Sequence, residues 1–160
     1  MAVNLTKGQK VNLSKAVEKL ANVTVGLGWD MAHNGRSIDC DSSVFVLREY
    51  TKHISKKVKS GLFGLFSKTE TEETTECGLE SSNDIVYYAH LAHNSGCINH
   101  RGDNLIGGSG KRNDDEQIAI NLKEMPMDIK KLVVVVNIYD CRNREQHFGM
   151  IKNCYARIVD

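Results

Sequence analysis

Apolar and polar residues alternate along much of the chain with a period of two, the pattern of a strand that has one buried face. Val23, Val25 and Leu27 form one such series, and the pattern returns at 117–122. The run at 132–139 is apolar and β-branched on both faces, which predicts a central strand covered on each side. Shorter runs predict three more strands, at 42–47, 84–89 and 155–159.

Helical periodicity is rare, and short helical turns are expected only at 14–21 and 142–146. The chain has 13 glycines and a single proline, so its turns rely on Gly, Asn and Asp, which tolerate positive φ. Short strands joined by such turns predict an all-β fold, a two-sheet β-sandwich with long loops and few short helical turns. With 160 residues, the chain is expected to form a single domain, 1–160.

Residues 55–82 interrupt the strand pattern, because a basic stretch, the apolar run Gly61-Leu62-Phe63-Gly64-Leu65-Phe66 and a Thr/Glu-rich stretch follow one another. We expect a long surface loop whose apolar centre folds back on the sandwich. The alternative is an amphipathic helix over 56–68 that touches a membrane surface through Val58, Leu62, Leu65 and Phe66. Gly61 and Gly64 weigh against that helix, because each costs roughly 1 kcal/mol relative to Ala.

The charge balance excludes some classes of function. With 21 Lys+Arg against 20 Asp+Glu and 6% aromatic residues, the chain lacks the composition of a nucleic-acid-binding protein, and no nucleic-acid partner is expected. No run approaches the ~20 apolar residues of a membrane-spanning helix, and the first residues do not resemble a secretion signal. A soluble, cytoplasmic protein is therefore expected. The five scattered cysteines, without a C-x-x-C pair, are expected to be reduced.

Carboxylates beside glycines provide the candidate chemistry. Asp30 ends the first alternating strand, and Asp39 and Asp41 share one face of a predicted strand, because side chains two residues apart point the same way. A glycine-rich loop at 102–110 is followed by Asp114, Asp115 and Glu116. Carboxylate and carbonyl oxygens are the ligands that Ca²⁺ prefers, so Ca²⁺ is the predicted cofactor. The alternative is that these are ordinary turn residues. The spacing fits neither an EF-hand nor a P-loop.

A second cluster suits a different metal. His90, His93, Cys97 and His100 lie within eleven residues, and imidazole and thiolate groups suit zinc. A turn at 94–96 would bring His93 near Cys97, although strand alternation sends some of the four side chains to opposite faces. A zinc-binding protein is therefore the alternative, and an interaction module without a metal is a third. No nucleophile elbow or zinc-protease motif is present, so an enzyme is not expected.

Several motifs resemble those of the TerD family of tellurium-resistance and stress proteins. They are Lys7-Gly8, Val11-Asn12-Leu13, Gly26-Leu27-Gly28-Trp29-Asp30, Asp39-Cys40-Asp41-Ser42-Ser43, Gly102-Asp103-Asn104-Leu105, Asp114-Asp115-Glu116-Gln117-Ile118 and Gln146-His147-Phe148-Gly149. The similarity runs, with interruptions, from about residue 5 to residue 159. It implies a β-sandwich that binds calcium between loops at one end, in bacterial systems linked to tellurite resistance, phage defence and general stress, with no known catalysis.

The resemblance assigns the calcium ligands to these acidic and loop positions, with Leu105 and Gly107 contributing carbonyl oxygens. The predicted set is Asp30, Asp39, Asp41, Asp103, Asn104, Leu105, Gly107, Asp114, Asp115 and Glu116. Three features depart from the family pattern: Lys111 and Arg112 follow the glycine loop, 55–82 is an atypical insertion, and the C-terminus is apparently short. A short C-terminus would leave an exposed sheet edge that favours self-association or a protein partner.

Overall fold

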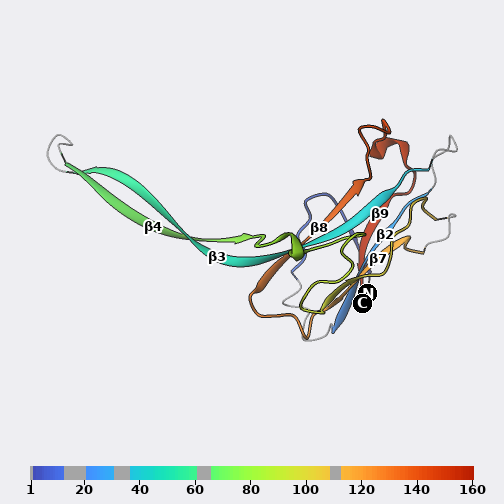
Figure 1. Cartoon of the computed structure of the whole chain (residues 1–160), viewed down its shortest axis with the longest axis horizontal. Coiled ribbons are helices and arrows are strands. Elements are labelled where there is room, and N and C mark those ends of the chain that lie inside the picture. The colour runs from blue at the N-terminus through green and yellow to red at the C-terminus, as the bar shows by residue number, and fades with distance from the viewer. Residues whose placement is uncertain (1, 13–20, 31–36, 61–65, 109–112) are drawn as a thin grey trace.

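The computed structural model describes residues 2–12, 21–30, 37–60, 66–108 and 113–160. Within these ranges the predicted all-β class is confirmed, and two antiparallel sheets pack against each other (Figure 1). The five-stranded sheet has the order β1 (Ala2–Leu5), β9 (Tyr155–Val159), β2 (Asn22–Gly28), β7 (Glu116–Asn121) and β6 (Ile98–His100). The four-stranded sheet contains β3 (Cys40–Ser60), β4 (Phe66–Gly78), β5 (Ile85–Val86) and β8 (Ile129–Ile138).

The buried core lies between the two sheets. Val23 and Val25 of β2 and Ile118 of β7 pack in one cluster with Val44 and Val46 of β3. Alternate residues of these strands point inward, as the period of two predicts. Burial of each such side chain contributes roughly 1.5–3 kcal/mol. A second cluster continues the core toward the end of the sandwich where Asp39 and Asp41 lie. It contains Leu27, Trp29, Ile38, Cys40 and Ile138.

Strand β8 differs from its prediction. The apolar run at 132–139 predicted a central strand, but in the described part of the chain β8 pairs only with β3, along Cys40–Arg48. Its valines are half-buried on both faces, and Leu132, Val134 and Val136 face the core. The β-branched run therefore predicted the strand correctly but not its place in the sheet.

In the ranges that the structure describes, regular helix is limited to two 3₁₀ turns, Ser82–Asp84 and Phe148–Met150. The first replaces the beginning of the strand predicted at 84–89, of which only β5 forms. Residues 142–146 form hydrogen-bonded turns rather than a helical turn, with positive φ at Asp140 and Glu145. The helical turn predicted at 14–21 lies almost entirely outside the described residues. No helix in the described ranges is long and apolar enough to cross a membrane.

The prediction of a loop or helix at 55–82 was wrong. Strands β3 and β4 pair in continuous register from Arg48–Gly78 to Ser60–Phe66, and this two-stranded ribbon extends away from the sandwich (Figure 1). We call residues 49–60 and 66–77 the arm. Its threonines suit a strand better than a helix, and Lys–Glu pairs join the strands, as between Lys56 and Glu72. The residues from 61 to 65, on which the helix hypothesis partly rested, lie outside the described ranges.

Candidate metal centre

Three of the predicted carboxylates converge at one end of the sandwich. Asp39 immediately precedes β3, Asp41 is its second residue, and Asp103 follows β6 in the other sheet. One carboxylate oxygen from each lies within 4.8 Å of the other two, and these form the group in the described residues that could hold a metal ion. The shared direction of Asp39 and Asp41 follows from strand alternation, whereas the sheet packing brings in Asp103.

These carboxylates line a pocket of about 450 Å³, which we call the acidic pocket. Its lining is formed by Ser37, Asp39, Asp41, Tyr88, Asp103, Leu105, Tyr139 and Arg144. The rings of Tyr88 and Tyr139 meet edge to face at 6.0 Å, and the Arg144 guanidinium lies 5.1 Å from the centre of the Tyr139 ring. Three acidic groups and one basic group give the pocket an excess of negative charge.

Burial and mutual repulsion make the ionised pocket unfavourable without a cation. Burial, together with the charges of Asp39, Glu116 and Asp103, raises the pKa of Asp41 to about 6. Burial also raises the pKa values of Asp39 and Asp103. The Arg144 guanidinium, whose Nη1 is 3.7 Å from Asp39 Oδ2, lowers the pKa of Asp39 but does not outweigh burial. The other oxygen, Asp39 Oδ1, is buried without a hydrogen-bond partner, which is the state of an oxygen available to a cation.

Glu116 holds the backbone around the three carboxylates through hydrogen bonds. Its Oε2 accepts hydrogen bonds from the backbone N–H and the hydroxyl of Ser42, both at 2.7 Å, and its Oε1 accepts a longer one from Asn104 N at 3.4 Å. Gly102 N–H donates to His100 Nδ1, which leaves the His100 Nε2–H directed at Glu116 Oε2, 3.5 Å away. Burial alone would raise the pKa of Glu116, but the hydrogen bonds from His100 and Ser42 lower it. Glu116 therefore stays ionised and connects the two sheets.

The glycine-rich loop is held by Asn104 and Trp29. Asn104 Oδ1 accepts hydrogen bonds from the backbone N–H groups of Ile106 and Gly107, both at 3.1 Å. Gly107 has a φ of +79°, and a Cβ there would lie 2.4 Å from the indole nitrogen of Trp29. Only glycine satisfies both conditions. Leu105 lines the pocket, and the predicted metal bonds of the Leu105 and Gly107 carbonyls remain predictions.

The other predicted ligands have protein partners of their own. Asp114 accepts a hydrogen bond from Arg157 Nε at 2.8 Å, Asp115 accepts one from Trp29 N–H at 2.8 Å, and Asp30 accepts one from Asn153. The structure does not bring these three carboxylates into the group formed by Asp39, Asp41 and Asp103. Lys111 and Arg112 lie outside the described residues.

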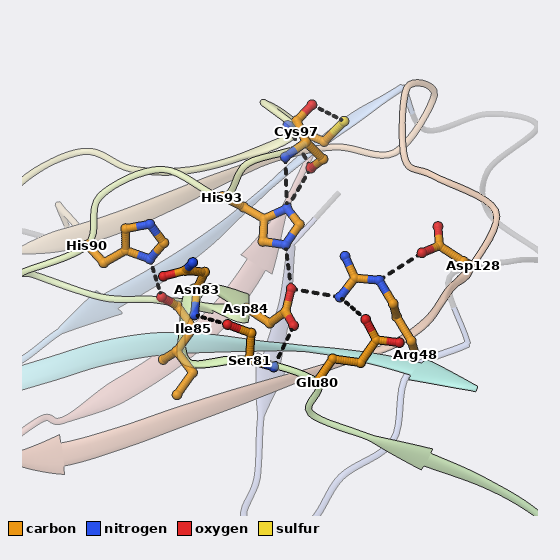
Figure 2. Close-up of polar contacts among 11 residues, drawn as sticks. Arg48, Glu80, Ser81, Asn83, Asp84, Ile85, His90, His93, Cys97 and Asp128 are labelled. Atoms are coloured by element: carbon orange, nitrogen blue, oxygen red, sulfur yellow. Dashed lines mark hydrogen bonds and ion pairs between the residues drawn. The ribbon is translucent and has the colours of Figure 1, made fainter. Parts of the chain in front are cut away.

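His90, His93 and Cys97 of the alternative zinc site point to different partners (Figure 2). His90 Nδ1–H donates to the Ile85 carbonyl, and Cys97 Sγ donates to the Glu124 carbonyl. His93 Nδ1 accepts the Ser95 N–H, so its Nε2–H donates to Asp84 Oδ1 at 3.1 Å. Within the described ranges, these residues form no group of three that could share a metal ion.

Sequence reasoning missed several residues that line the acidic pocket or bind its carboxylates. Asn137 donates to Asp41 Oδ2 at 2.9 Å from the neighbouring strand. The signal was present, because Asn137 is the single polar residue in an apolar run. No such signal marked Arg144, Tyr88 and Tyr139, because they lie in turns that are far from Asp39 in the sequence.

The fold and the site define a class, β-sandwich proteins with a carboxylate-lined pocket between loops at one end. The TerD domain family model matches residues 1–59 and 74–160, and the chain belongs to the TerD family. Stress response protein SCP2 from Bacillus subtilis (strain 168) is 39% identical over the whole chain, which spans 72% of that relative. General stress protein 16U from the same organism is 36% identical, with 69% of its length covered. Tellurium resistance protein TerD from Serratia marcescens is 33% identical, also with 69% covered.

Proposed function

We propose that the acidic pocket binds a calcium ion, and that this ion fixes the loop 102–108 against the first residues of β3. Asp39, Asp41 and Asp103 would hold the ion. The observation that carries the proposal is the unpartnered buried oxygen of Asp39 among three carboxylates whose oxygens lie within 4.8 Å of one another. Bound there, a divalent cation would supply the positive charge that the three carboxylates lack.

The donor set favours calcium over softer metals. All three side chains offer oxygen, and His90, His93 and Cys97 of the alternative zinc site have other partners. Zn²⁺ prefers nitrogen and sulfur ligands, whereas Ca²⁺ takes six to eight oxygens. The remaining ligands would be waters or backbone carbonyls. Ca²⁺ also tolerates irregular geometry better than Mg²⁺, which demands a near-ideal octahedron.

We further propose a non-catalytic role in the cytoplasm, in a stress response. The names of relatives support the stress role, because two of them are stress proteins and a third is a tellurium resistance protein. The chemistry of the pocket supports binding rather than catalysis. Its carboxylates lie beside two tyrosines and an arginine, without a nucleophile paired to a base.

Thermal melts of metal-stripped protein with Ca²⁺, Mg²⁺ or Zn²⁺ test this proposal. At a Ca²⁺ concentration about 100 times the Kd, linkage predicts about 2.7 kcal/mol of stabilisation, or a rise in Tm of about 5–10 °C. Asp41→Asn should lose the response, whereas Asp140→Asn, which removes an exposed carboxylate outside the group, should keep it. A response to Zn²⁺ alone, or an equal response of Asp41→Asn to Ca²⁺, would contradict the assignment.

A further inference from the structure

Cys40 and Cys154 form a pair of thiols that the acidic pocket does not use. Cys40 is the first residue of β3, and Cys154 immediately precedes β9 in the other sheet. Both cysteines are reduced. A side-chain hydrogen bond joins the two thiols. The fold therefore brings together two sulfur atoms that are distant in the sequence and belong to opposite sheets.

Strand alternation places Cys40 on the inner face of β3. Val44 and Val46, four and six residues further along this strand, lie in the core between the sheets, and all three side chains are fully buried. Cys40 itself belongs to the core cluster that contains Leu27 and Trp29 at the end of β2. The Cys40 thiol therefore points from β3 toward the sheet that contains β2 and β9.

The same argument places Cys154 from the other side. Side chains two apart along a strand point the same way, so Cys154 shares a face with Ala156 and Ile158. Ala156 is the register partner of Leu27, which is buried in the core, and Ile158 packs against the core. The Cys154 side chain is therefore directed toward the inner face of β3, in agreement with its hydrogen bond to Cys40.

The two thiols differ in their access to solvent. Cys154 is exposed, whereas Cys40 is buried at 0% exposure. The hydrogen bond from the Cys40 thiol lowers the pKa of the Cys154 thiol, and the thiolate is the reactive form of cysteine. An oxidant from solvent therefore reaches Cys154 first, with Cys40 in contact behind it. Cysteines that react with peroxides are accessible in this way and often have a second cysteine beside them.

The other three cysteines have different surroundings. Cys77 is exposed on the arm, and Cys97 Sγ donates a hydrogen bond to the Glu124 carbonyl at 2.9 Å. Cys141 is partly buried and packs against the core cluster that contains Cys40. A disulfide between Cys40 and Cys141 is therefore the alternative to one between Cys40 and Cys154, and the hydrogen bond between thiols favours Cys154.

We propose that Cys40 and Cys154 are a peroxide-reactive thiol pair, which a hydroperoxide converts to a disulfide between the two sheets. The Cys154 thiolate attacks one peroxide oxygen and becomes a sulfenic acid, while the other oxygen leaves and takes up the proton that the thiol released. The Cys40 sulfur then attacks the Cys154 sulfur and expels hydroxide, which takes the Cys40 proton to form water. With hydrogen peroxide, the two thiols lose two electrons and two protons, and two water molecules form.

The disulfide would fix the first residue of β3 to the residue before β9. Cross-linking two positions so far apart in the sequence restricts the unfolded chain, so the oxidised protein should be more stable than the reduced one. The sulfur atoms need to approach from hydrogen-bonding distance to about 2.05 Å. The proposal does not depend on calcium binding by the acidic pocket, and its test is carried out in EDTA.

Oxidation of the full chain with stoichiometric hydrogen peroxide tests the proposal. A thiol assay under denaturing conditions should show the loss of two of the five thiols. Mass spectrometry of a non-reduced digest should show Cys40 linked to Cys154 within one chain. The Tm of the oxidised protein should rise by about 5–15 °C, and dithiothreitol should reverse both the disulfide and the rise in Tm.

The decisive variant is Cys154→Ser, because this position is exposed. It should form no disulfide at Cys40, and peroxide should not raise its Tm. The matched control is Cys77→Ser, which removes an exposed cysteine of the arm and should behave like the parent. In Cys40→Ala, the Cys154 sulfenic acid should persist and be trapped by dimedone. Circular dichroism establishes that each variant is folded before oxidation.

Several results would overturn the proposal. One is a disulfide between Cys40 and Cys141, and another is equal loss of thiols and an equal rise in Tm in the parent and Cys154→Ser. A parent that retains all five thiols at a peroxide concentration that oxidises free cysteine would also overturn it. So would disulfides that form only between chains and disappear in Cys77→Ser.

Discussion

At the scale of single residues, the carboxylates that would bind a cation in the acidic pocket lower the stability of the metal-free protein. Asp41 is buried with two carboxylates beside it, and its pKa rises to about 6 from an ordinary value of 3.8. An acid whose pKa is higher in the folded state than in the unfolded state favours folding when it is protonated. Ionisation in the folded protein therefore lowers the free energy of unfolding.

The sign of this effect gives a pH prediction. Between pH ~4 and pH ~6 the folded protein holds the Asp41 proton while the unfolded chain releases it, so stability from this group falls as the pH rises and is fully lost above pH ~6. The rise of the Asp41 pKa from 3.8 to about 6 corresponds to about 3 kcal/mol of stability. Urea unfolding of the metal-free protein across this pH range measures the loss of stability, with Asp41→Asn as the comparison.

We expect the parent to lose stability relative to Asp41→Asn over this pH range. Carboxylates with lowered pKa values, such as Asp84 and Asp128, lose their stabilising effect only as the pH falls below about 4, so they do not mask the effect. If the free energies of unfolding of the two proteins changed with pH in parallel, Asp41 would not titrate in this way.

Residue-level prediction worked where spacing alone decides the direction of a side chain. Asp39 and Asp41 share a site because they are two apart at the start of a strand. Asp114 and Asp115 looked like equally good ligands, but in the structure Arg157 and the Trp29 backbone bind them. Those partners are distant in sequence, so no local pattern could have shown them.

At the scale of elements, Arg48 marks the boundary between sandwich and arm. It lies at the bulge in the β3–β8 pairing, and its guanidinium binds Asp84 and Asp128, both at 2.7 Å (Figure 2). Asp84 is buried, receives His93 Nε2–H and closes the capping box of the 3₁₀ turn at Ser82–Asp84. This network fixes the segment that follows the arm, the 3₁₀ turn at Ser82–Asp84, to the sandwich.

Arg48→Ala should therefore destabilise the protein strongly. It leaves the buried Asp84 carboxylate without its guanidinium, and removal of one partner from such a pair costs about 3–5 kcal/mol. Because Arg48 is partly exposed, we expect about 2–4 kcal/mol in urea unfolding. Lys52→Ala, which breaks an exposed pair of the arm, should cost less than about 1 kcal/mol. Similar losses in both variants would contradict this account of the boundary.

The arm itself should contribute little to the stability of the sandwich. Lys52 and Thr74 are register partners, so replacing residues 53–73 by Asn-Gly would close the ribbon with a two-residue hairpin turn. We expect the Tm of this variant to stay within about 2 °C of the parent. A fall of more than about 6 °C would show that the outer arm supports the core.

The arm also shows where sequence patterns fail at this scale. Its β3 half alternates and could have been recognised as a strand, but the apolar run and the Thr/Glu-rich stretch favoured a loop or helix. The hairpin is decided by thirteen cross-strand pairs. Such pairing cannot be read from either strand alone, because the partners of each residue depend on the register.

At the scale of the whole molecule, the acidic pocket joins the two sheets. Asp39 immediately precedes β3 and Asp41 is its second residue, whereas Asp103 follows β6 and Glu116 begins β7 in the other sheet. The fold class and most strands could be predicted from alternation, because one face of each strand must be buried. The packing of one sheet on the other, which completes the site, could not be predicted from alternation.

The calcium site should be visible in a crystal structure of the protein grown with Ca²⁺. We expect one ion with oxygens of Asp39, Asp41 and Asp103 at about 2.3–2.6 Å, and Asp39 Oδ1 among its ligands. An empty acidic pocket at saturating Ca²⁺, or an ion held instead by Asp30, Asp114 or Asp115, would contradict it.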